Sequence, residues 1–475
     1  AAGAAPAQAW LLLPRVRAHP AGPRHADLLP EPGPGLPPEH PAALAEHVWP
    51  ARVDRADSGD LRMHGWAVAD LVAEHGTPVY LLDEADFRAR ARAFAQAFAG
   101  CDVYYAAKAF LSRSVARWVA EEGLSIDVCS GGELLVALEA GFPADRIALH
   151  GNNKSDDEIA HAMDAGVGLV VLDSFEEMER LSAAASRAGR VQPVLVRVRV
   201  GVEAHTHEYI ATAHEDVKFG FSLQAGDALE AVRRAADDPA LELRGLHSHI
   251  GSQIFDTAGF EVAAQRLVRL MAQARADLHV AMTELDLGGG LGIAYVAADD
   301  PEPLASLASR LLEIVRAECE RHDLPMPRVA VEPGRALVGP AMITVYTVGT
   351  VKDVDGIRTY VSVDGGMSDN IRTALYDADY TVTLANRAPA GPLSLARVVG
   401  KHCESGDVVV RDAWLPTDIA PGDLLAVAAT GAYCRSMASN YNLVPRPPVV
   451  AVDATGSRVL LRRESFADLL ACDVG

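Results

Sequence analysis

Short apolar runs alternate with amphipathic stretches from about residue 84 onward. The segment 84–98, EADFRARARAFAQAF, carries Phe87, Ala91, Phe94 and Phe98 at helical spacing, which predicts an amphipathic helix. Eight apolar runs typical of β-strands follow it, at 102–107, 124–129, 146–151, 167–173, 193–200, 243–249, 283–288 and 328–333. Because a helical stretch separates each run from the next, the pattern predicts βαβ units with parallel strands.

Eight such units within about 250 residues are typical of a TIM-type (β/α)8 barrel. A doubly wound open sheet is the alternative, and periodicity alone does not separate the two folds. A barrel carries a further expectation, because active sites of this fold lie at the C-terminal ends of the strands. Polar and glycine residues should therefore gather where the apolar runs end.

The pattern changes after Arg335. The apolar segments become short and separated by turn residues, at 342–354, 358–366, 381–385, 396–403, 407–415 and 423–430. They predict an antiparallel β domain, built as a barrel or sandwich, and VYLLD at 79–83 is a candidate further strand. We expect an extended Pro/Ala-rich segment at 1–45, strands at 46–83 that contribute to the β domain, the barrel at 84–338 and the β domain at 339–475.

Composition excludes several classes of partner. The formal net charge of −21 argues against nucleic acid or an anionic membrane. None of the six cysteines forms a C-x-x-C pair, so a reducing compartment is expected. No apolar run reaches the ~20 residues needed to span a membrane, and AWLLLP at 9–14 is too short for a signal-peptide core. We expect a cytoplasmic protein.

Chemically useful residues follow nearly every predicted strand of the barrel. Lys108 follows the first strand, and it allows two interpretations: a surface or ion-paired residue, or a Schiff-base lysine whose burial lowers its pKa. GGGLG at 288–292 indicates either a tight turn or a loop whose backbone N–H groups bind an anion. EPGR at 332–335 ends a strand with a carboxylate and a guanidinium, which suit a pyridine nitrogen and a phosphate or carboxylate.

Two histidine pairs leave a metal site open. HSHIGSQ at 247–253 offers an imidazole that can stack on a cofactor ring and the Ser252 hydroxyl for a phosphate. Its two histidines are also spaced so that a strand would present both on one face, as a zinc site requires. HTH at 205–207 is likewise either a metal pair or a solvated loop.

Taken together, the motifs resemble those of diaminopimelate decarboxylases. These are fold-type III pyridoxal-phosphate (PLP) enzymes that make L-lysine and CO2 from meso-2,6-diaminopimelate, the last step of lysine biosynthesis. The resemblance runs from roughly residue 60 to the C-terminus and implies a PLP-dependent carboxy-lyase that acts as a homodimer. The motifs that carry it are YYAAKA, GVEAHTHEYIATAHEDVKFGFS, HSHIGSQ, GGGLGI, EPGR, DGGMSDN, CESGD and GAYCRSMASNYN.

The resemblance implies a role for each matching residue, with no metal. Lys108 would hold PLP covalently, His249 would stack on its ring, and Glu332 would contact the pyridine nitrogen. Cys403 would donate a proton, and it would reach the barrel from the neighbouring subunit together with Glu404. The residues around the phosphate would be Ser252, Gly288, Gly289, Gly290, Pro333, Gly334 and Arg335, and the substrate would contact Arg335, Arg372, Tyr376, Glu404 and Tyr433, the last also touching the cofactor.

One departure from the family pattern leaves the substrate open. The family usually has proline on both sides of the substrate-binding arginine, whereas Ile371 and Thr373 flank Arg372 here. Since proline stiffens the loop that presents the guanidinium, its loss can redirect specificity. A decarboxylase of ornithine, arginine or lysine on the same scaffold is therefore an alternative. A barrel racemase, which needs a second base, and a non-catalytic PLP-binding protein are further alternatives.

Overall fold

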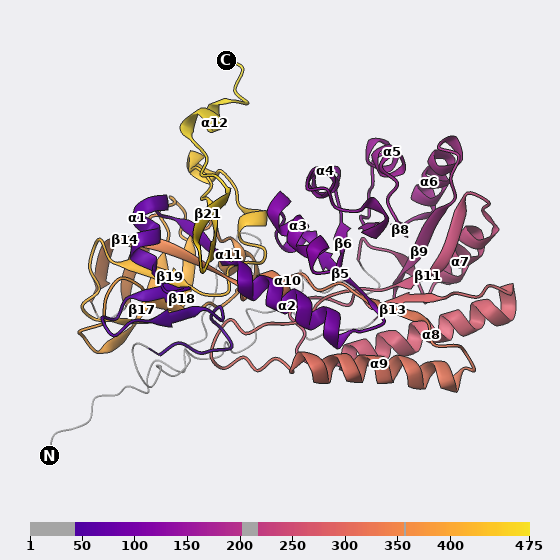
Figure 1. The fold of residues 1–475 in the computed structure, drawn as a ribbon, viewed down its shortest axis with the longest axis horizontal. Helices are drawn as coiled ribbons and strands as arrows, with labels where there is room; N and C mark the ends of the chain where they lie inside the picture. The colour runs from indigo at the N-terminus through magenta and orange to yellow at the C-terminus, as the bar shows by residue number, and fades with distance from the viewer. Residues whose placement is uncertain (1–42, 202–216, 356–357) are drawn as a thin grey trace.

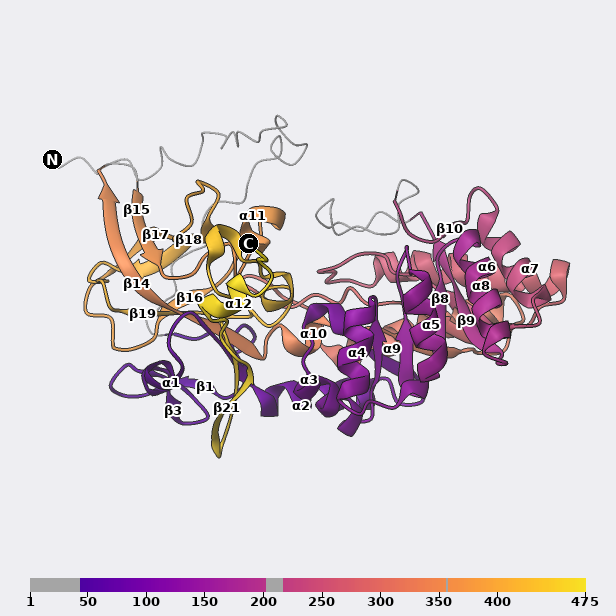
Figure 2. The ribbon, with the colours of Figure 1, turned by 90° about the horizontal axis from the view of Figure 1, so that it is seen from above.

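The computed structural model describes residues 43–201, 217–355 and 358–475, which form two domains lying end to end (Figure 1). The described part of the chain excludes nearly all of the predicted Pro/Ala-rich segment at 1–45 and the HTH pair at 205–207. One domain is a barrel ringed by helices and the other is built from β-strands, as Figure 2 shows from above.

Eight parallel strands close the barrel. Each pairs in parallel with its neighbours, and the ring is completed because the last strand pairs with the first. This confirms the predicted TIM-type barrel over the doubly wound sheet. The strands in ring order are β5 (Asp102–Ala106), β6 (Ser125–Val128), β7 (Ile147–Leu149), β8 (Leu169–Leu172), β9 (Gln192–Arg199), β11 (Leu241–His247), β12 (Glu284–Asp286) and β13 (Arg328–Val331), and the short β10 (Phe221–Ser222) pairs with β9 outside the ring.

Helices cover the outside of the barrel (Figure 1). The first, expected at 84–98, begins where the Asp83 carboxylate accepts a hydrogen bond from the backbone N–H of Asp86, and it ends at Ala97. The next four begin in the same way at a serine N-cap, namely Ser112, Ser130, Ser155 and Ser174. The helices are α2 (Glu84–Ala97), α3 (Arg113–Glu121), α4 (Gly131–Glu139), α5 (Asp156–Ala165), α6 (Phe175–Arg187), α7 (Asp227–Asp237), α8 (Ala258–Leu278) and α9 (Leu304–Arg321).

Alternation along the strands sorts their side chains between two environments. Residues such as Ile126, Leu246 and Leu285 belong to the large apolar core that also includes the helices. Their neighbours in sequence point the other way, because successive side chains of a strand face opposite sides. Asp127, His247 and Asp286 are therefore directed into the barrel, where they are buried. The barrel interior thus receives charged and titratable groups.

The β domain is built around one long strand, β14 (Met342–Val354). VYLLD forms β4 (Val79–Asp83) between β14 and β20, as the sequence predicts for this segment. The sheet is mainly antiparallel, but β15–β17 and β4–β20 pair in parallel, and β20 and β21 were not predicted. The other strands are β15 (Arg358–Val363), β16 (Val382–Leu384), β17 (Leu393–Val399), β18 (Val408–Pro416), β19 (Leu424–Val427), β20 (Val449–Asp453) and β21 (Gly456–Leu461).

A small sheet precedes these two domains in the chain. Strands β1 (Val53–Arg55), β2 (Leu61–Met63) and β3 (Trp66–Ala67) pair only with one another, and α1 (Val68–His75) follows them. Leu61 and Met63 pack in one apolar cluster with Ile343 of β14. An isolated antiparallel bridge between Asp60 and Asn386 also attaches this unit to the β domain. None of the described helices is both long and apolar enough to cross a membrane.

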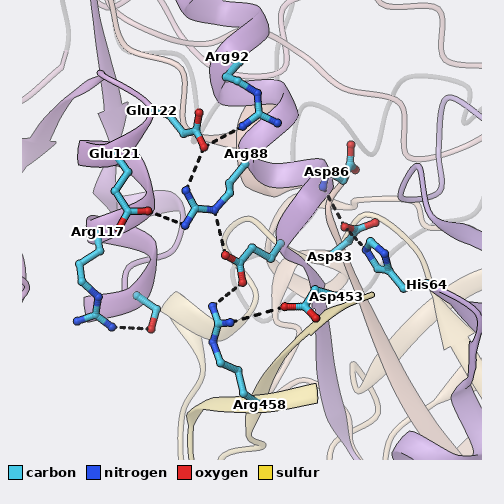
Figure 3. Close-up of polar contacts among 12 residues, drawn as sticks. His64, Asp83, Asp86, Arg88, Arg92, Arg117, Glu121, Glu122, Asp453 and Arg458 are labelled. Carbon is cyan, nitrogen blue, oxygen red and sulfur yellow. Dashed lines mark hydrogen bonds and ion pairs between the residues drawn. The ribbon is translucent and has the colours of Figure 1, made fainter. Parts of the chain in front are cut away.

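A cluster of charged residues joins β21 to the first two barrel helices (Figure 3). Arg88 of α2 donates to Glu84 (3.0 Å), Glu121 (2.6 Å) and Glu122 (3.0 Å). Arg458 of β21 contacts Glu84 from the other domain. Both guanidinium groups also lie over the ring of Trp118, at 5.6 and 5.3 Å from its centroid. The contacts of α2 therefore connect the two domains.

Replacing Arg88 should weaken this junction more than replacing its neighbour Arg92. Among the described residues, Arg92 donates only to Glu122, and its side chain is more exposed than that of Arg88. We expect Arg88→Met to lower the free energy of unfolding by about 1 kcal/mol, and Arg92→Met by less than about half of that. Urea-induced unfolding at low and high salt measures both. Equal effects of the two variants, or an Arg88 effect unchanged by salt, would contradict this assignment.

Candidate active site

The pairing of β13 with β5 brings Lys108 and Glu332 to one pocket. Lys108 lies in the single turn Ala107–Ala109 directly after β5, and Glu332 directly follows β13. The backbone N–H of Ala106 donates to the carbonyl of Pro333 at 3.2 Å, which locks the two strand ends together. The residues that line the pocket are Ala106, Lys108, His249, Ser252, Gly290, Leu291, Glu332, Gly334, Arg335 and Tyr433.

Most of the predicted cofactor residues thus line this one pocket. Gly288, Gly289 and Pro333 do not line it directly but hold its wall. Gly289 donates its backbone N–H to Nδ1 of His249 at 3.1 Å, and Glu332 donates its own to the carbonyl of Gly288 at 2.9 Å. The GGGLG loop is therefore packed against both the histidine loop and the EPGR segment.

The glycines of this loop are required by close backbone packing. A Cβ atom on Gly289 would lie 2.2 Å from the carbonyl oxygen of Glu332, and one on Gly290 would lie 2.3 Å from that of Gly251. Gly290 also has a φ of +108°, which L side chains rarely adopt. Close packing therefore accounts for Gly289 and Gly290, and Gly290 also lines the pocket, so the tight turn and the anion-binding loop both remain predictions.

Lys108 differs from the sequence expectation of a buried lysine with a lowered pKa. Its side chain is exposed to solvent within the pocket. Desolvation by the surrounding protein acts to lower its pKa, but the negative potential of Tyr433, Asp127 and Glu332 outweighs it and the pKa is raised. The expectation of a depressed pKa was wrong because these groups lie far from Lys108 in the sequence.

Glu332 is held between two imidazoles. Its Oε1 lies 2.9 Å from Nε2 of His150, and its Oε2 lies 3.2 Å from Nε2 of His247. All three side chains are buried. Burial by itself raises the pKa of Glu332, but the two histidines together bring it well below the usual range. Sequence reasoning missed His150, whose only signal was its position at the end of a predicted strand.

The alternative in which His247 and His249 share a zinc ion does not fit the observed geometry. His247 faces Glu332, whereas Nδ1 of His249 accepts from the Gly289 N–H. Within the described ranges, the residues close enough to share a metal are instead His150, His247 and Glu332. The strand predicted to present both histidines on one face ends at His247, so His249 belongs to the following loop.

Two arginines meet at a tyrosine between the domains. Arg335 donates to the hydroxyl of Tyr295 and, at 2.8 Å, to that of Ser252. Arg372, which begins the short helix α11 (Arg372–Tyr376), lies over the ring of Tyr295 at 4.7 Å and donates to the hydroxyl of Tyr380. The two predicted substrate arginines are thus brought together, around a Tyr295 that the sequence analysis did not single out.

Of the other site residues predicted in the β domain, some lie near the two arginines and some lie on the surface. The ring of Tyr433 lies under Arg335 at 4.7 Å, and its backbone N–H donates to the carbonyl of Ala109 at 2.9 Å. Tyr376 ends α11 and is half-buried. Cys403 and Glu404 are exposed on the loop between β17 and β18, and neither lines the pocket.

The exposed Cys403–Glu404 loop is anchored from below by two sequence motifs. His402 is buried, with Nε2 2.8 Å from the Ser368 hydroxyl and Nδ1 3.1 Å from Oδ1 of Asn442. The Asp407 carboxylate accepts from the backbone N–H groups of His402 and Met367, at 2.8 and 2.6 Å. DGGMSDN and SNYN therefore fix the base of this loop while its tip faces solvent.

Hydrogen bonds fix the segment around Arg372, where the family usually has prolines. The Thr373 hydroxyl donates to the carbonyl of Val409 at 2.9 Å, in a buried position. The backbone N–H of Arg372 donates to Oδ1 of Asn370 at 3.3 Å. The threonine thus restrains the chain through a contact with β18, where a proline would restrain it through its ring.

Comparison with known proteins identifies this arrangement. The pyridoxal-binding domain of the pyridoxal-dependent decarboxylases matches residues 84–339, which is the barrel. A diaminopimelate decarboxylase of Mycobacterium leprae (strain TN) is 55% identical over 471 residues, covering 97% of this chain and 100% of that relative. The chain belongs to the diaminopimelate decarboxylase family.

Solved structures match most of this two-domain chain. The diaminopimelate decarboxylase from M. jannaschii, in co-complex with L-lysine, matches with a TM-score of 0.84 and 29% identity, over 90% of this chain and 98% of that one. A lysine/ornithine decarboxylase from Vibrio vulnificus complexed with putrescine matches with a TM-score of 0.69 and 25% identity, over 82% and 97% of the respective chains. The similarity to the first covers more of this chain.

The pocket of this family member fits a pyridoxal cofactor. It offers an accessible primary amine (Lys108), a carboxylate held ionised (Glu332) and an imidazole (His249). Ser252 and Arg335 add a hydroxyl and a guanidinium at 2.8 Å from one another, a donor pair suited to a phosphate. The aldehyde of the cofactor can react with Lys108, its ring nitrogen can face Glu332, and its phosphate can contact Ser252 and Arg335.

The buried histidine at Glu332 should make stability depend on pH. Burial lowers the pKa of His247 to about 4, whereas the unfolded value is about 6.5. Between these values the unfolded chain binds more protons, so stability falls as the pH is lowered from 6.5 towards 4. We expect His247→Gln to flatten this dependence by roughly 1 kcal/mol per pH unit, measured by urea unfolding from pH 4.5 to 7.5. The exposed His279→Asn is the control, and an unchanged slope in His247→Gln would contradict the prediction.

Proposed function

We propose that this protein is a PLP-dependent carboxy-lyase that converts meso-2,6-diaminopimelate to L-lysine and CO2, the last step of lysine biosynthesis. The observation that carries this proposal is 55% identity over the full length of a relative named diaminopimelate decarboxylase. The pocket supports it independently, because it combines Lys108, Glu332 and His249 at the strand ends of the barrel.

In this proposal the barrel residues bind and orient the cofactor. PLP, when bound, would supply an electron sink for the negative charge left on the α-carbon when CO2 departs. Lys108 would hold it covalently and His249 would pack against its ring. Glu332 would keep a proton on the pyridine nitrogen. Ser252, Gly288, Gly289, Gly290, Pro333, Gly334 and Arg335 would surround the phosphate.

Arg372 would recognise the distal end of the substrate. It is buried, and its Nε atom has no hydrogen-bond partner among the described residues. An amino acid that lacks a distal carboxylate would leave the Nε atom of this guanidinium without a partner, and a site built for a polar group strongly rejects such an analogue. Arg335, Tyr376 and Tyr433 would complete the substrate contacts, and Glu404 would pair with the distal ammonium group.

Cys403 would supply the proton that replaces the carboxylate on the α-carbon. A thiol can deliver a proton near neutral pH when it is positioned against the reacting carbon. In one chain Cys403 is exposed and outside the pocket, so we propose that it and Glu404 complete the site of a second copy. The active unit would then be a homodimer with shared sites.

A decarboxylase of lysine or ornithine is the second candidate. It is favoured by the replacement of both prolines beside Arg372 and by the similarity to a lysine/ornithine decarboxylase structure. The bond from Thr373 to Val409 argues for a fixed Arg372, and hence for the first candidate. We further propose a cytoplasmic location, with which the free cysteines of the described chain are compatible.

Substrate identity is tested by CO2 release from meso-diaminopimelate beside L-ornithine, L-arginine and L-lysine. We expect release from diaminopimelate alone, with L-lysine as the product. Release only from another of the four amino acids would overturn the substrate assignment.

Two variants test the proposed residue roles. Lys108→Ala should abolish the borohydride-trapped adduct, and Arg372→Met should raise KM for diaminopimelate about tenfold or more because a buried charge pair is lost.

The shared-site proposal is tested by mixing two inactive variants. Lys108→Ala and Cys403→Ala each disable a different part of the site. Random reassociation makes half of the dimers mixed, each with one intact site of two, so activity should return to about a quarter of the wild-type value. Dissociation at dilute concentration followed by remixing and assay provides the measurement. Activity no greater than the sum of the two separate variants would contradict sharing.

A further inference from the structure

Three carboxyl groups are directed into one end of the barrel. Asp127 is the penultimate residue of β6, Asp286 ends β12 and Glu332 follows β13, with exposed fractions of 3%, 2% and 4%. Buried carboxylates that interact cannot all ionise, because each negative charge raises the cost of the next. The protein must therefore determine which of the three carries the charge, and only a charged Glu332 would serve a pyridine nitrogen.

The imidazoles of His150 and His247 contact only one of these carboxyls. They approach Glu332 at 2.9 and 3.2 Å, one at each oxygen. Their rings meet edge to face, with centroids 5.0 Å apart and planes at 70°. By contrast, no histidine contact is seen at Asp286 among the described residues: its Oδ1 accepts the backbone N–H of Gly288 at 2.7 Å, and its carboxyl group interacts with that of Glu332. Oδ2 of Asp127 has no hydrogen-bond partner among the described residues.

The electrostatics follow this asymmetry. Burial, and then the charge of Glu332, raise the pKa of Asp127 and of Asp286 well above the usual range, whereas that of Glu332 is lowered. Burial also lowers the pKa of both His150 and His247. The His247 imidazole donates its Nε2–H to Oε2 of Glu332, whereas Nε2 of His150 makes a polar contact with Oε1 without hydrogen-bond geometry. The other charged or titratable groups near this cluster include Tyr104, Lys108, Glu133, Arg197 and His249.

A divalent cation is a poorer occupant of this cluster. Two histidines and a carboxylate are an adequate donor set for zinc. However, Lys108 and Arg197 already direct positive charge towards Glu332. A metal would enter against that charge and would occupy the carboxylate that faces the pocket.

We propose that His150 and His247 are positioning residues that fix Glu332 as the one ionised carboxylate of the barrel interior, and so keep the pyridine nitrogen of the cofactor protonated. This inference rests on the proposed function, and it assigns roles to two histidines that need not contact either the substrate or the cofactor. Their side chains act through Glu332, His247 by a hydrogen bond to Oε2 and His150 by a polar contact with Oε1.

The direct test is nuclear magnetic resonance of PLP labelled with nitrogen-15 in its ring, bound to the holoenzyme. The chemical shift of this nucleus reports whether the pyridine nitrogen is protonated. We expect the nitrogen to be protonated in the wild-type protein across pH 6.5–8.5 and to lose its proton within this range in His150→Leu and His247→Leu. His150→Gln and His247→Gln keep an N–H donor of similar reach and should retain the wild-type signal.

Kinetics separate a role through Glu332 from a merely structural role. Each leucine variant should lower kcat by about 10- to 100-fold, the usual effect of losing a partner that orients a primary ligand, with KM within about threefold. In a Glu332→Gln background the same leucine substitutions should change kcat by less than about twofold, because the group they act on is gone. If the leucine substitutions lowered kcat in the Glu332→Gln background by the same factor as in the wild type, the inference would be overturned.

Two results are decisive even if a leucine variant fails to fold. An unprotonated ring nitrogen in the wild-type holoenzyme at pH 7 would overturn the inference without any variant. It would also be overturned if the ring nitrogen lost its proton in His150→Gln or His247→Gln as it is expected to do in Glu332→Gln. The proposed function fails separately, if the wild-type protein forms the Lys108 adduct but releases no CO2 from diaminopimelate. The state of the ring nitrogen can be read in either case.

Discussion

The closure of the barrel by β13 and β5 is the constraint on which the rest of the structure depends. Ala330 pairs with Asp102 and Val331 with Val103, and Arg328 adds an ion pair to Asp102 at the base of this seam. These contacts join segments that lie at opposite ends of the barrel sequence. Because the chain leaves both strands at the same end, the lysine after one and the carboxylate after the other enter a single pocket. Every proposed role of the pocket requires this pairing.

The barrel interior contains buried charged groups at positions where well-packed apolar side chains would make the folded protein more stable. Apolar side chains such as Ala148, Val171 and Leu195 fill only part of the interior as a separate cluster. The rest is occupied by buried carboxyls, imidazoles and Arg197, whose ionisation each carries a desolvation cost. That cost is tolerable because the large core outside the strands supplies most of the apolar burial. The scaffold is thereby able to hold a charged group in a fixed place.

The β domain contributes Tyr433 to the pocket and contacts the barrel at two separate places. Near the pocket, Tyr433 reaches the carbonyl of Ala109 and packs under Arg335. On the outer side, Arg458 joins the charged cluster on α2. These two attachments fix the position of Arg372 relative to the barrel, so a substrate group held by Arg372 would lie at a set distance from Lys108. The same domain presents Cys403 to solvent, where a second chain could use it.

The sequence by itself determined the eight barrel strands, the first helix, the joining of 79–83 to the β domain and the grouping of Lys108, His249 and Glu332. Such features follow from local periodicity and from motifs at strand ends. Tertiary structure alone decided the parallel pairings of the β domain, the contacts of His150 and Tyr295, and the raised pKa of Lys108. Pairing and pKa depend on distances between groups far apart in the chain. A local pattern records which side chains face inward, but not which of them meet.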